Sequence, residues 1–334
     1  MSERFGTLRS LLHDAPDRRV WLELCAELER WPAGAEVEEV AVPYARDILA
    51  GWPSAMLAPP DGLQLPPDVP WVGLVRRVSG AARDLRAWSR AIRARGGWID
   101  HLTVTKGAAS ELVEEVLEGS RALEHLSVER GGLGLVFMRG LARRELPFLR
   151  SLSLDLNPLG DEGCYALAKA PWLPGLEELS LSQVGATDAG AASLLARGFE
   201  RMHTLDLSSN GVGDGAALAL CVEGAYPALR ALDLSDNAVG DEGALALEEV
   251  MGGQLEALDL SYNRIGPRVV TLLERAGAKR PGVIVDVSEN HVPPGYVDPF
   301  GEDDDVEEIA WRDWERADDL DEWETWTTWK RNKG

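Results

Sequence analysis

The sequence is poor in cysteine, in lysine and in long apolar runs. Its three cysteines, Cys25, Cys164 and Cys221, lie far apart and form no CxxC pair, which excludes a disulfide scaffold and a zinc ribbon. No stretch approaches the roughly 20 apolar residues of a membrane-spanning helix, and the first residues show no secretion-signal pattern. We therefore expect a protein of the reducing cytoplasm that binds no membrane.

Basic side chains are scarce: 34 Lys and Arg stand against 56 Asp and Glu, so the net charge is −22. Such a polyanion repels nucleic acid, and any partner is predicted to be basic. The acidic excess is uneven. Residues 1–98 carry 13 acidic and 13 basic side chains, residues 99–297 carry 29 and 16, and residues 298–334 carry 14 and 5. Among the basic residues Arg dominates, which, with frequent Ala and Gly, is typical of a GC-rich bacterial source.

Catalytic signatures are missing as well. The sequence contains no GxSxG, phosphate-binding loop, HExxH, dinucleotide-binding fingerprint or paired-cysteine metal pattern. The sequence therefore predicts no catalytic residue, no metal site and no cofactor. Hydrophobic residues make up 45% of the chain, which is enough for a folded core.

What the sequence does contain is a phrase, LxxLxLxxN, that returns at a fixed interval. Its copies lie at 99–107, 123–131, 149–157, 176–184, 202–210, 229–237, 255–263 and 282–290. From the third copy onward the starts are 27, 26, 27, 26 and 27 residues apart. A period of this length indicates a repeat architecture of about eight units.

The phrase resembles the signature of the leucine-rich repeat family, and the unit length resembles the family's ribonuclease-inhibitor-like branch. The resemblance covers residues 99–290 and implies an α/β fold, a right-handed leucine-rich repeat solenoid with a parallel sheet inside and helices outside. The residue pattern agrees, because alternate leucines such as Leu205 and Leu207 form a strand with one buried face, and stacked units bury a continuous core. The family has many functions, so the resemblance predicts fold rather than activity.

Each strand is followed by an Ala- and Leu-rich stretch with helical spacing. Four aspartates at the starts of these stretches are predicted to cap the first free N–H groups of their helices. They are Asp161, Asp188, Asp214 and Asp241. Pro267 suits the first turn of a later helix. By the family resemblance, five residues form a structural asparagine ladder that satisfies backbone groups of adjacent turns: Asn157, Asn210, Asn237, Asn263 and Asn290.

Residues between the leucines of the phrase are predicted to face solvent on the concave side of the sheet, in columns spaced about 4.8 Å apart. The fifth residue of the phrase forms a column that ends in the aspartate column, Asp206, Asp233, Asp259 and Asp286. These carboxylates repel one another, so a basic partner or a cation relieves the repulsion. The alternative is that aspartate is a common filling of the motif and is simply solvated.

Other residues of the concave columns complete the predicted partner-binding surface: Asp155, Glu129, Glu178 and Tyr262. Tyr262 is the only aromatic residue among them, so tight binding is not expected. His101 and His125 fall at equivalent positions of adjacent units, but two ligands on neighbouring strands are a weak signal, and no metal site is predicted.

Residues 1–79 are predicted to form a helical region with a proline-rich connector. Two helical pieces flank the Ala15-Pro16 turn, and the order of elements resembles the companion domain that precedes repeats in some bacterial proteins. Packing candidates in the helices are Trp21, Leu22, Leu24, Leu28 and Trp31.

The sequence predicts a basic helix over residues 80–98. This helix is expected to cap the solenoid, which is assigned to residues 99–297. Leu85, Trp88 and Ile92 share its apolar face. Its opposite side is either a solvated basic face or a patch for an anionic partner. The arginines of that side are Arg83, Arg86, Arg90 and Arg93.

Residues 298–334 form an acidic tail that holds five of the twelve tryptophans. Simple acidic disorder is not so rich in tryptophan. The tail is therefore either a carboxy-terminal cap over the last unit or a recognition segment for a basic partner. In the second case Trp323 and Trp326 contribute to partner binding.

The sequence thus predicts a monomeric, non-catalytic interaction module that binds a basic protein on its concave face. The alternative is a GTPase-regulating or effector-type protein whose activity lies in the amino-terminal half. Some related repeat proteins present a catalytic arginine from a loop near the first units, and Arg130 follows a strand in a comparable place.

Overall fold

The computed structural model describes residues 2–31, 36–53, 56–60, 69–119, 122–222, 224–250, 255–280 and 282–292. The predicted tail at 298–334, with Trp323 and Trp326, lies outside the described residues. Within the described ranges, no helix combines the length and the apolar character that crossing a bilayer requires.

The amino-terminal helices pack around an apolar centre. They are α1 (Ser2–His13), α2 (Arg18–Glu29), η1 (Glu36–Ala41), α3 (Val42–Leu49) and η3 (Pro70–Leu74). The predicted break near Ala15-Pro16 is confirmed, and Asp17 caps α2 by accepting a hydrogen bond of 2.6 Å from the Arg19 N–H. Four of the five packing candidates are buried, but Leu22 is exposed because it lies on the outer face of α2.

Nine parallel strands form one open sheet in sequence order. They are β1 (Arg77–Ala81), β2 (His101–Lys106), β3 (His125–Val128), β4 (Ser151–Ser153), β5 (Glu178–Ser180), β6 (Thr204–Asp206), β7 (Ala231–Asp233), β8 (Ala257–Asp259) and β9 (Ile284–Asp286). The α/β repeat solenoid is therefore confirmed, with one strand more than the eight phrases predict. Strand β1 pairs with β2 and crosses the predicted boundary between residues 79 and 80.

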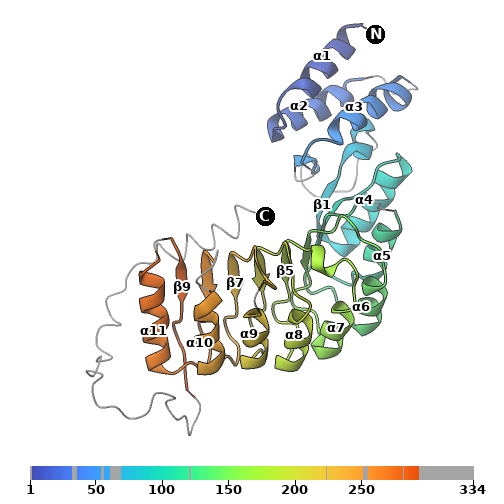
Figure 1. Cartoon of the computed structure of the whole chain (residues 1–334). Coiled ribbons are helices and arrows are strands. Elements are labelled where there is room, and N and C mark those ends of the chain that lie inside the picture. Colours follow the sequence, from blue (N-terminus) through green and yellow to red (C-terminus); the bar gives the residue numbers. More distant parts are fainter. Residues whose placement is uncertain are drawn as a thin grey trace. The chain divides into compact units, whose positions relative to one another are not determined.

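Helices alternate with the strands and lie along one face of the sheet (Figure 1). They are α4 (Ala82–Ala94), α5 (Ser110–Gly119), α6 (Leu135–Ala142), α7 (Gly160–Leu167), η4 (Leu173–Gly175), α8 (Asp188–Leu195), α9 (Asp214–Leu220), α10 (Asp241–Val250) and α11 (Pro267–Ala278). Helix α4, predicted as a separate cap, follows β1 and is the helix of the additional first unit. Pro267 begins α11, as predicted.

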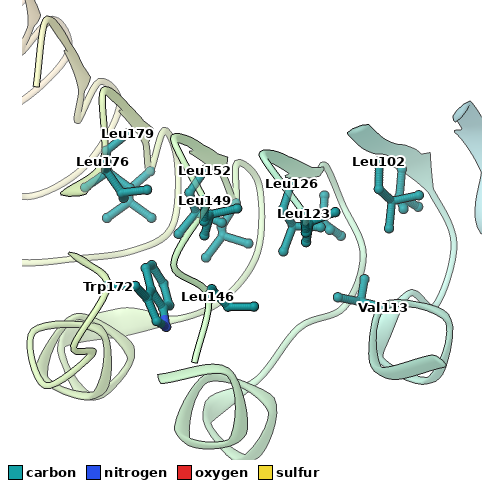
Figure 2. Packing of buried hydrophobic residues seen from close by; sticks show 14 of the residues in the cluster. Leu102, Val113, Leu123, Leu126, Leu146, Leu149, Leu152, Trp172, Leu176 and Leu179 are labelled. Carbon is teal, nitrogen blue, oxygen red and sulfur yellow. The ribbon is translucent and has the colours of Figure 1, made fainter. Parts of the chain in front are cut away.

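The core is a continuous row of ladder leucines between the sheet and the helices. Figure 2 shows Leu102, Leu126, Leu152 and Leu179 from four consecutive strands side by side, and all four are buried. Removing one such side chain leaves a cavity that its neighbours cannot fill, which typically costs about 2–5 kcal/mol.

Each ladder asparagine joins its own unit to the preceding one. The Asn237 amide donates to the Leu234 carbonyl in its own unit at 3.1 Å and to the Leu207 carbonyl in the preceding unit at 2.9 Å. Its Oδ1 accepts from the Val212 N–H at 2.9 Å. Equivalent bonds to the preceding unit are made by Asn157, Asn210, Asn263 and Asn290. Because each asparagine pairs with backbone groups of two units, it stabilises the stacking of these units.

The aspartates at the helix starts also join units, which corrects their predicted role. Asp188 accepts hydrogen bonds not from its own helix but from the N–H groups of Gly213 at 2.9 Å and Ala216 at 2.8 Å, at the start of α9. Asp161 accepts from Thr187 at 2.7 Å in the same way. Asp214 and Asp241 also bond to the following unit. The free N–H groups of a helix are thus capped from the preceding unit.

Asp161 lies so close to Gly190, in the first turn of α8, that substitution of this glycine is predicted to destabilise the fold. A Cβ atom there would lie 2.3 Å from the Asp161 Oδ1 atom and 2.8 Å from the Asp161 Cα atom. We expect Gly190→Ala to lower the free energy of unfolding by about 1–3 kcal/mol, although alanine favours helices. Urea denaturation measures the change.

The matched control is Gly140→Ala in α6, where no atom lies within 4 Å of the added Cβ. That variant is expected to gain about 0.5–1 kcal/mol through helix propensity alone. Equal stabilities of the two variants would contradict the capping role of Asp161.

Candidate functional site

The sheet face opposite the helices carries the predicted columns in register. Strand pairing aligns Asp206 with Asp233, Asp233 with Asp259, and Asp259 with Asp286. Because side chains alternate along a strand, these residues point away from the leucine core. The aspartate column is therefore one continuous line of carboxylates across β6 to β9.

The depth of the aspartates differs from the prediction of freely solvated side chains. Asp206, Asp233 and Asp259 are only 7%, 6% and 6% exposed. Asp286, on the edge strand of the described sheet, is half-buried.

Hydrogen bonds from serines hold each carboxylate in place. Asp233 Oδ1 accepts from the Ser235 N–H at 3.0 Å and from the Ser235 hydroxyl at 2.7 Å. The same pair of bonds links Ser208 to Asp206 and Ser261 to Asp259. The serine column that follows the strands therefore orients the aspartate column.

Burial changes the acidity of two of the carboxyl groups on this face, Asp259 and Asp155. Burial raises the pKa of Asp259 to about 6, and the negative charges of Asp233 and Asp286 add to this effect, while the hydrogen bonds from Ser261 oppose it. Burial also raises the pKa of Asp155, with Asp206 contributing in the same direction.

Asp155 extends the acidic line toward the earlier strands. Its carboxylate accepts hydrogen bonds from the hydroxyls of Ser153 at 2.9 Å and Ser180 at 2.7 Å, and from the Ser182 N–H at 2.9 Å. It thereby joins the units of β4 and β5 where the asparagine ladder is interrupted at Val184.

The remaining predicted residues lie apart from this line. Glu178 accepts from the Ser151 hydroxyl at 2.9 Å, and Glu129 pairs with Arg130 at 3.5 Å. Tyr262 is 57% exposed and has a left-handed backbone with φ of 56°. It directly follows Ser261, beyond the end of β8, and is the one large exposed aromatic side chain near the described part of the aspartate column.

The first three strands place a different group on the same face. Arg77 pairs in register with His101, and His101 with His125. The two imidazole rings stack with centroids 3.9 Å apart and planes at 10°. Burial lowers the pKa of His101 to about 2 and that of His125 to about 4, and the charge of Arg77 acts in the same direction, so both rings are neutral at pH 7. No three-residue metal-binding cluster occurs in the described ranges.

Arg77 is the concave residue that the sequence pattern missed. Its strand replaces the ladder leucines by Val75 and Val78 and has Gly80 in place of the next one, so the phrase is hard to detect. The available signal is the spacing: residue 75 lies 24 residues before the first recognised phrase at residue 99.

The arginines of α4 are largely occupied by acidic partners. Arg86 pairs with Glu111 at 2.9 Å and Arg90 with Glu115 at 3.8 Å, both on α5, and Arg83 pairs with Asp84 at 3.3 Å. Leu85, Trp88 and Ile92 are buried on the other side. These contacts favour the packing role of the helix over a patch for an external anion.

Comparisons with known proteins agree with the repeat fold. The family profile described as "Leucine Rich repeat" matches residues 145–168, 202–221, 227–247 and 255–268. A similar solved structure is the crystal structure of the Rad7 and Elc1 complex in yeast, with a TM-score of 0.50 and 14% identity over 88% of this chain and 76% of that chain. A search of the curated proteins gave no significant match. The chain thus has the leucine-rich repeat fold.

The raised pKa of Asp259 predicts a pH dependence of stability. An unfolded Asp ionises near pH 4, whereas the folded Asp259 keeps its proton to about pH 6, so the wild-type protein loses stability as the pH rises through this window. Asn keeps the acceptor for Ser261 but cannot ionise. We expect Asp259→Asn to be more stable by about 1–2 kcal/mol at pH 7, with the difference vanishing near pH 4.

Urea denaturation at pH 4, 5.5 and 7 measures this difference. Glu274→Gln is the control, because Glu274 is exposed on α11 and its loss should leave the pH profile of the wild type unchanged. Parallel profiles for Asp259→Asn and the wild type would show that Asp259 titrates normally.

Proposed function

We propose that the protein is a non-catalytic scaffold that binds a basic protein segment along the aspartate column. The observation that carries this proposal is the line of four carboxylates in register, one strand apart, on the open face of the sheet. Lys and Arg side chains of an extended segment complement the charge of such a line.

The energetics of the column support a binding role. Asp206, Asp233 and Asp259 are more than nine-tenths buried, and Asp259 has a raised pKa because its charge is unfavourable in the folded state. A Lys or Arg side chain that binds beside Asp259 reduces this penalty on association. Charged groups that reduce stability in this way are typical of functional surfaces.

The shape of the face suits an extended segment. The residues beside the column are small, such as Ser208, Ser235 and Ala231, so no bulky side chain separates the carboxylates from a segment that lies along them. Tyr262, at the end of β8, supplies an aromatic side chain against which the segment can pack. Asp155, Glu129 and Glu178 continue the acidic surface toward β3, and the tail residues Trp323 and Trp326 belong to the proposal as a second contact region.

The repeat fold is compatible with this role. The similar yeast structure is described as a complex of two proteins, so the fold occurs in protein assemblies. The unit length of 26–27 residues favours the ribonuclease-inhibitor-like branch, and we propose a monomeric, cytoplasmic protein. The GTPase-regulating alternative stays a prediction, and Arg130 is paired with Glu129 on the same loop.

A fluorescent octa-lysine peptide tests the proposal. The variant Asp206→Asn, Asp233→Asn, Asp259→Asn keeps the acceptors for the serines and removes three negative charges. We expect it to bind the peptide at least 10-fold more weakly than the wild type in fluorescence anisotropy at about 50 mM salt, since close charge pairs supply 1–3 kcal/mol each.

The matched control removes the same number of charges elsewhere. Glu145, Glu200 and Glu274 are exposed, and the variant Glu145→Gln, Glu200→Gln, Glu274→Gln changes the net charge equally. It is expected to lose less than about 3-fold, because exposed charges outside the contact are screened. Equal losses in the two variants would mean that net charge alone attracts the peptide, and the column proposal would then be wrong.

A further inference from the structure

At the third and fifth positions of the phrase, the first three strands carry no carboxylate, whereas the later strands carry five: Glu178 and the aspartate column. At these positions β1 to β3 present a guanidinium, two imidazoles and three hydroxyls. These residues, named the amino-terminal donor patch, are Arg77, His101, His125, Ser79, Thr103 and Ser127. All six side chains have hydrogen-bond donors, whereas the aspartate column consists of acceptors.

Arg77 is the charged centre of this patch. It is half-buried, and in the described ranges its guanidinium forms no ion pair and no side-chain hydrogen bond. Burial lowers its pKa, and the nearby charge of Arg18 acts in the same direction. Arg18 itself is held by the carbonyls of Met56, Ala58 and Pro59 at 2.9, 2.7 and 2.7 Å. Among the residues that the structure describes, the positive charge of the patch therefore forms no ion pair with an acid.

The histidines shape the patch without adding charge. Their rings stack at 3.9 Å, and a neutral imidazole still donates from one nitrogen. With one cation and neutral donors, the patch matches a singly charged oxyanion. A carboxylate fits this charge and accepts the two parallel bonds of a guanidinium, while a phosphate dianion would leave charge uncompensated.

We infer that the amino-terminal donor patch binds a carboxylate side chain of the same partner segment whose basic residues lie on the aspartate column. This inference rests on the proposed function and specifies it further. The partner is an extended segment of mixed charge, with an acidic residue over β1 to β3 and basic residues over β6 to β9.

The sheet sets the separation of the two charges in the partner. Arg77 on β1 and Asp206 on β6 are five strand spacings apart, which is about 24 Å. An extended chain covers that distance in about seven residues. The matching segment therefore has an Asp or Glu about seven residues from its nearest Lys or Arg.

Two peptides test this inference with the full-length protein. The first has an aspartate, six serines and four lysines, with blocked ends, and the second has asparagine in place of the aspartate. We expect the aspartate peptide to bind 3- to 10-fold more tightly in isothermal titration calorimetry at pH 7. Arg77→Gln should abolish this preference and leave the affinity for the asparagine peptide unchanged.

Arg150→Gln is the control variant, because Arg150 pairs with Glu177 outside the patch, and it should keep the full preference. In histidine-labelled protein, the ring signals of His101 and His125 are expected to shift with the aspartate peptide and not with the asparagine peptide.

The outcomes separate the two proposals. Equal binding of both peptides, with no effect of Arg77→Gln, overturns the donor patch and leaves the aspartate column intact. Failure of both peptides to bind contradicts the column and the patch together. A preference that survives Arg77→Gln places the carboxylate elsewhere and also overturns this inference.

Discussion

The structure depends on one constraint: polar backbone groups where the strands end and the helices begin are paired with side chains of neighbouring units. Asn237 bonds to carbonyls of two units, and Asp188 caps the helix of the next unit. Buried backbone groups without partners cost about 1–3 kcal/mol each, so the units cannot slide or tilt independently. The same bonds fix the register of the strands, and the register in turn creates the columns of the concave face.

The stacking of the units is accompanied by a strained backbone conformation that recurs in most units. From β3 onward, the eighth residue of the phrase has a left-handed backbone although none is glycine: Arg130, Leu156, Gln183, Ser209, Asp236, Tyr262 and Glu289. Such a conformation costs roughly 1–2 kcal/mol for an ordinary residue. In return, the N–H group of this residue extends the ladder beyond the strand, as Ser209 does by donating to the Ser235 carbonyl at 2.9 Å. The turn that carries Tyr262 outward is thus the same turn that locks the units together.

The sequence alone does not predict which unit the polar side chains of these ladders contact or how deeply they are buried. The period of the leucines predicts the strands and helices, because only stacked units can bury them. Spacing does not tell whether Asp188 caps its own helix or the next one, since that depends on how the units tilt. Alternation predicts that Asp233 lies on the face opposite the helices, but it does not predict that only 6% of this residue is exposed. The repeat pattern did not identify Arg77, because valines and a glycine replace the leucines of its strand.

The two ends of the concave face make different demands on a partner. A face with few aromatic side chains gains little from apolar contacts, so its affinity depends on charge and falls as salt screens it. A purely acidic line attracts any basic chain in either direction, because Lys and Arg satisfy it equally well when the segment is reversed. Donors over β1 to β3 and carboxylates over β6 to β9 remove that symmetry, since a reversed segment would bring its acid against Asp233 and its base against Arg77. Like charges in contact oppose binding, so the opposite ends select the orientation as well as the composition of the segment.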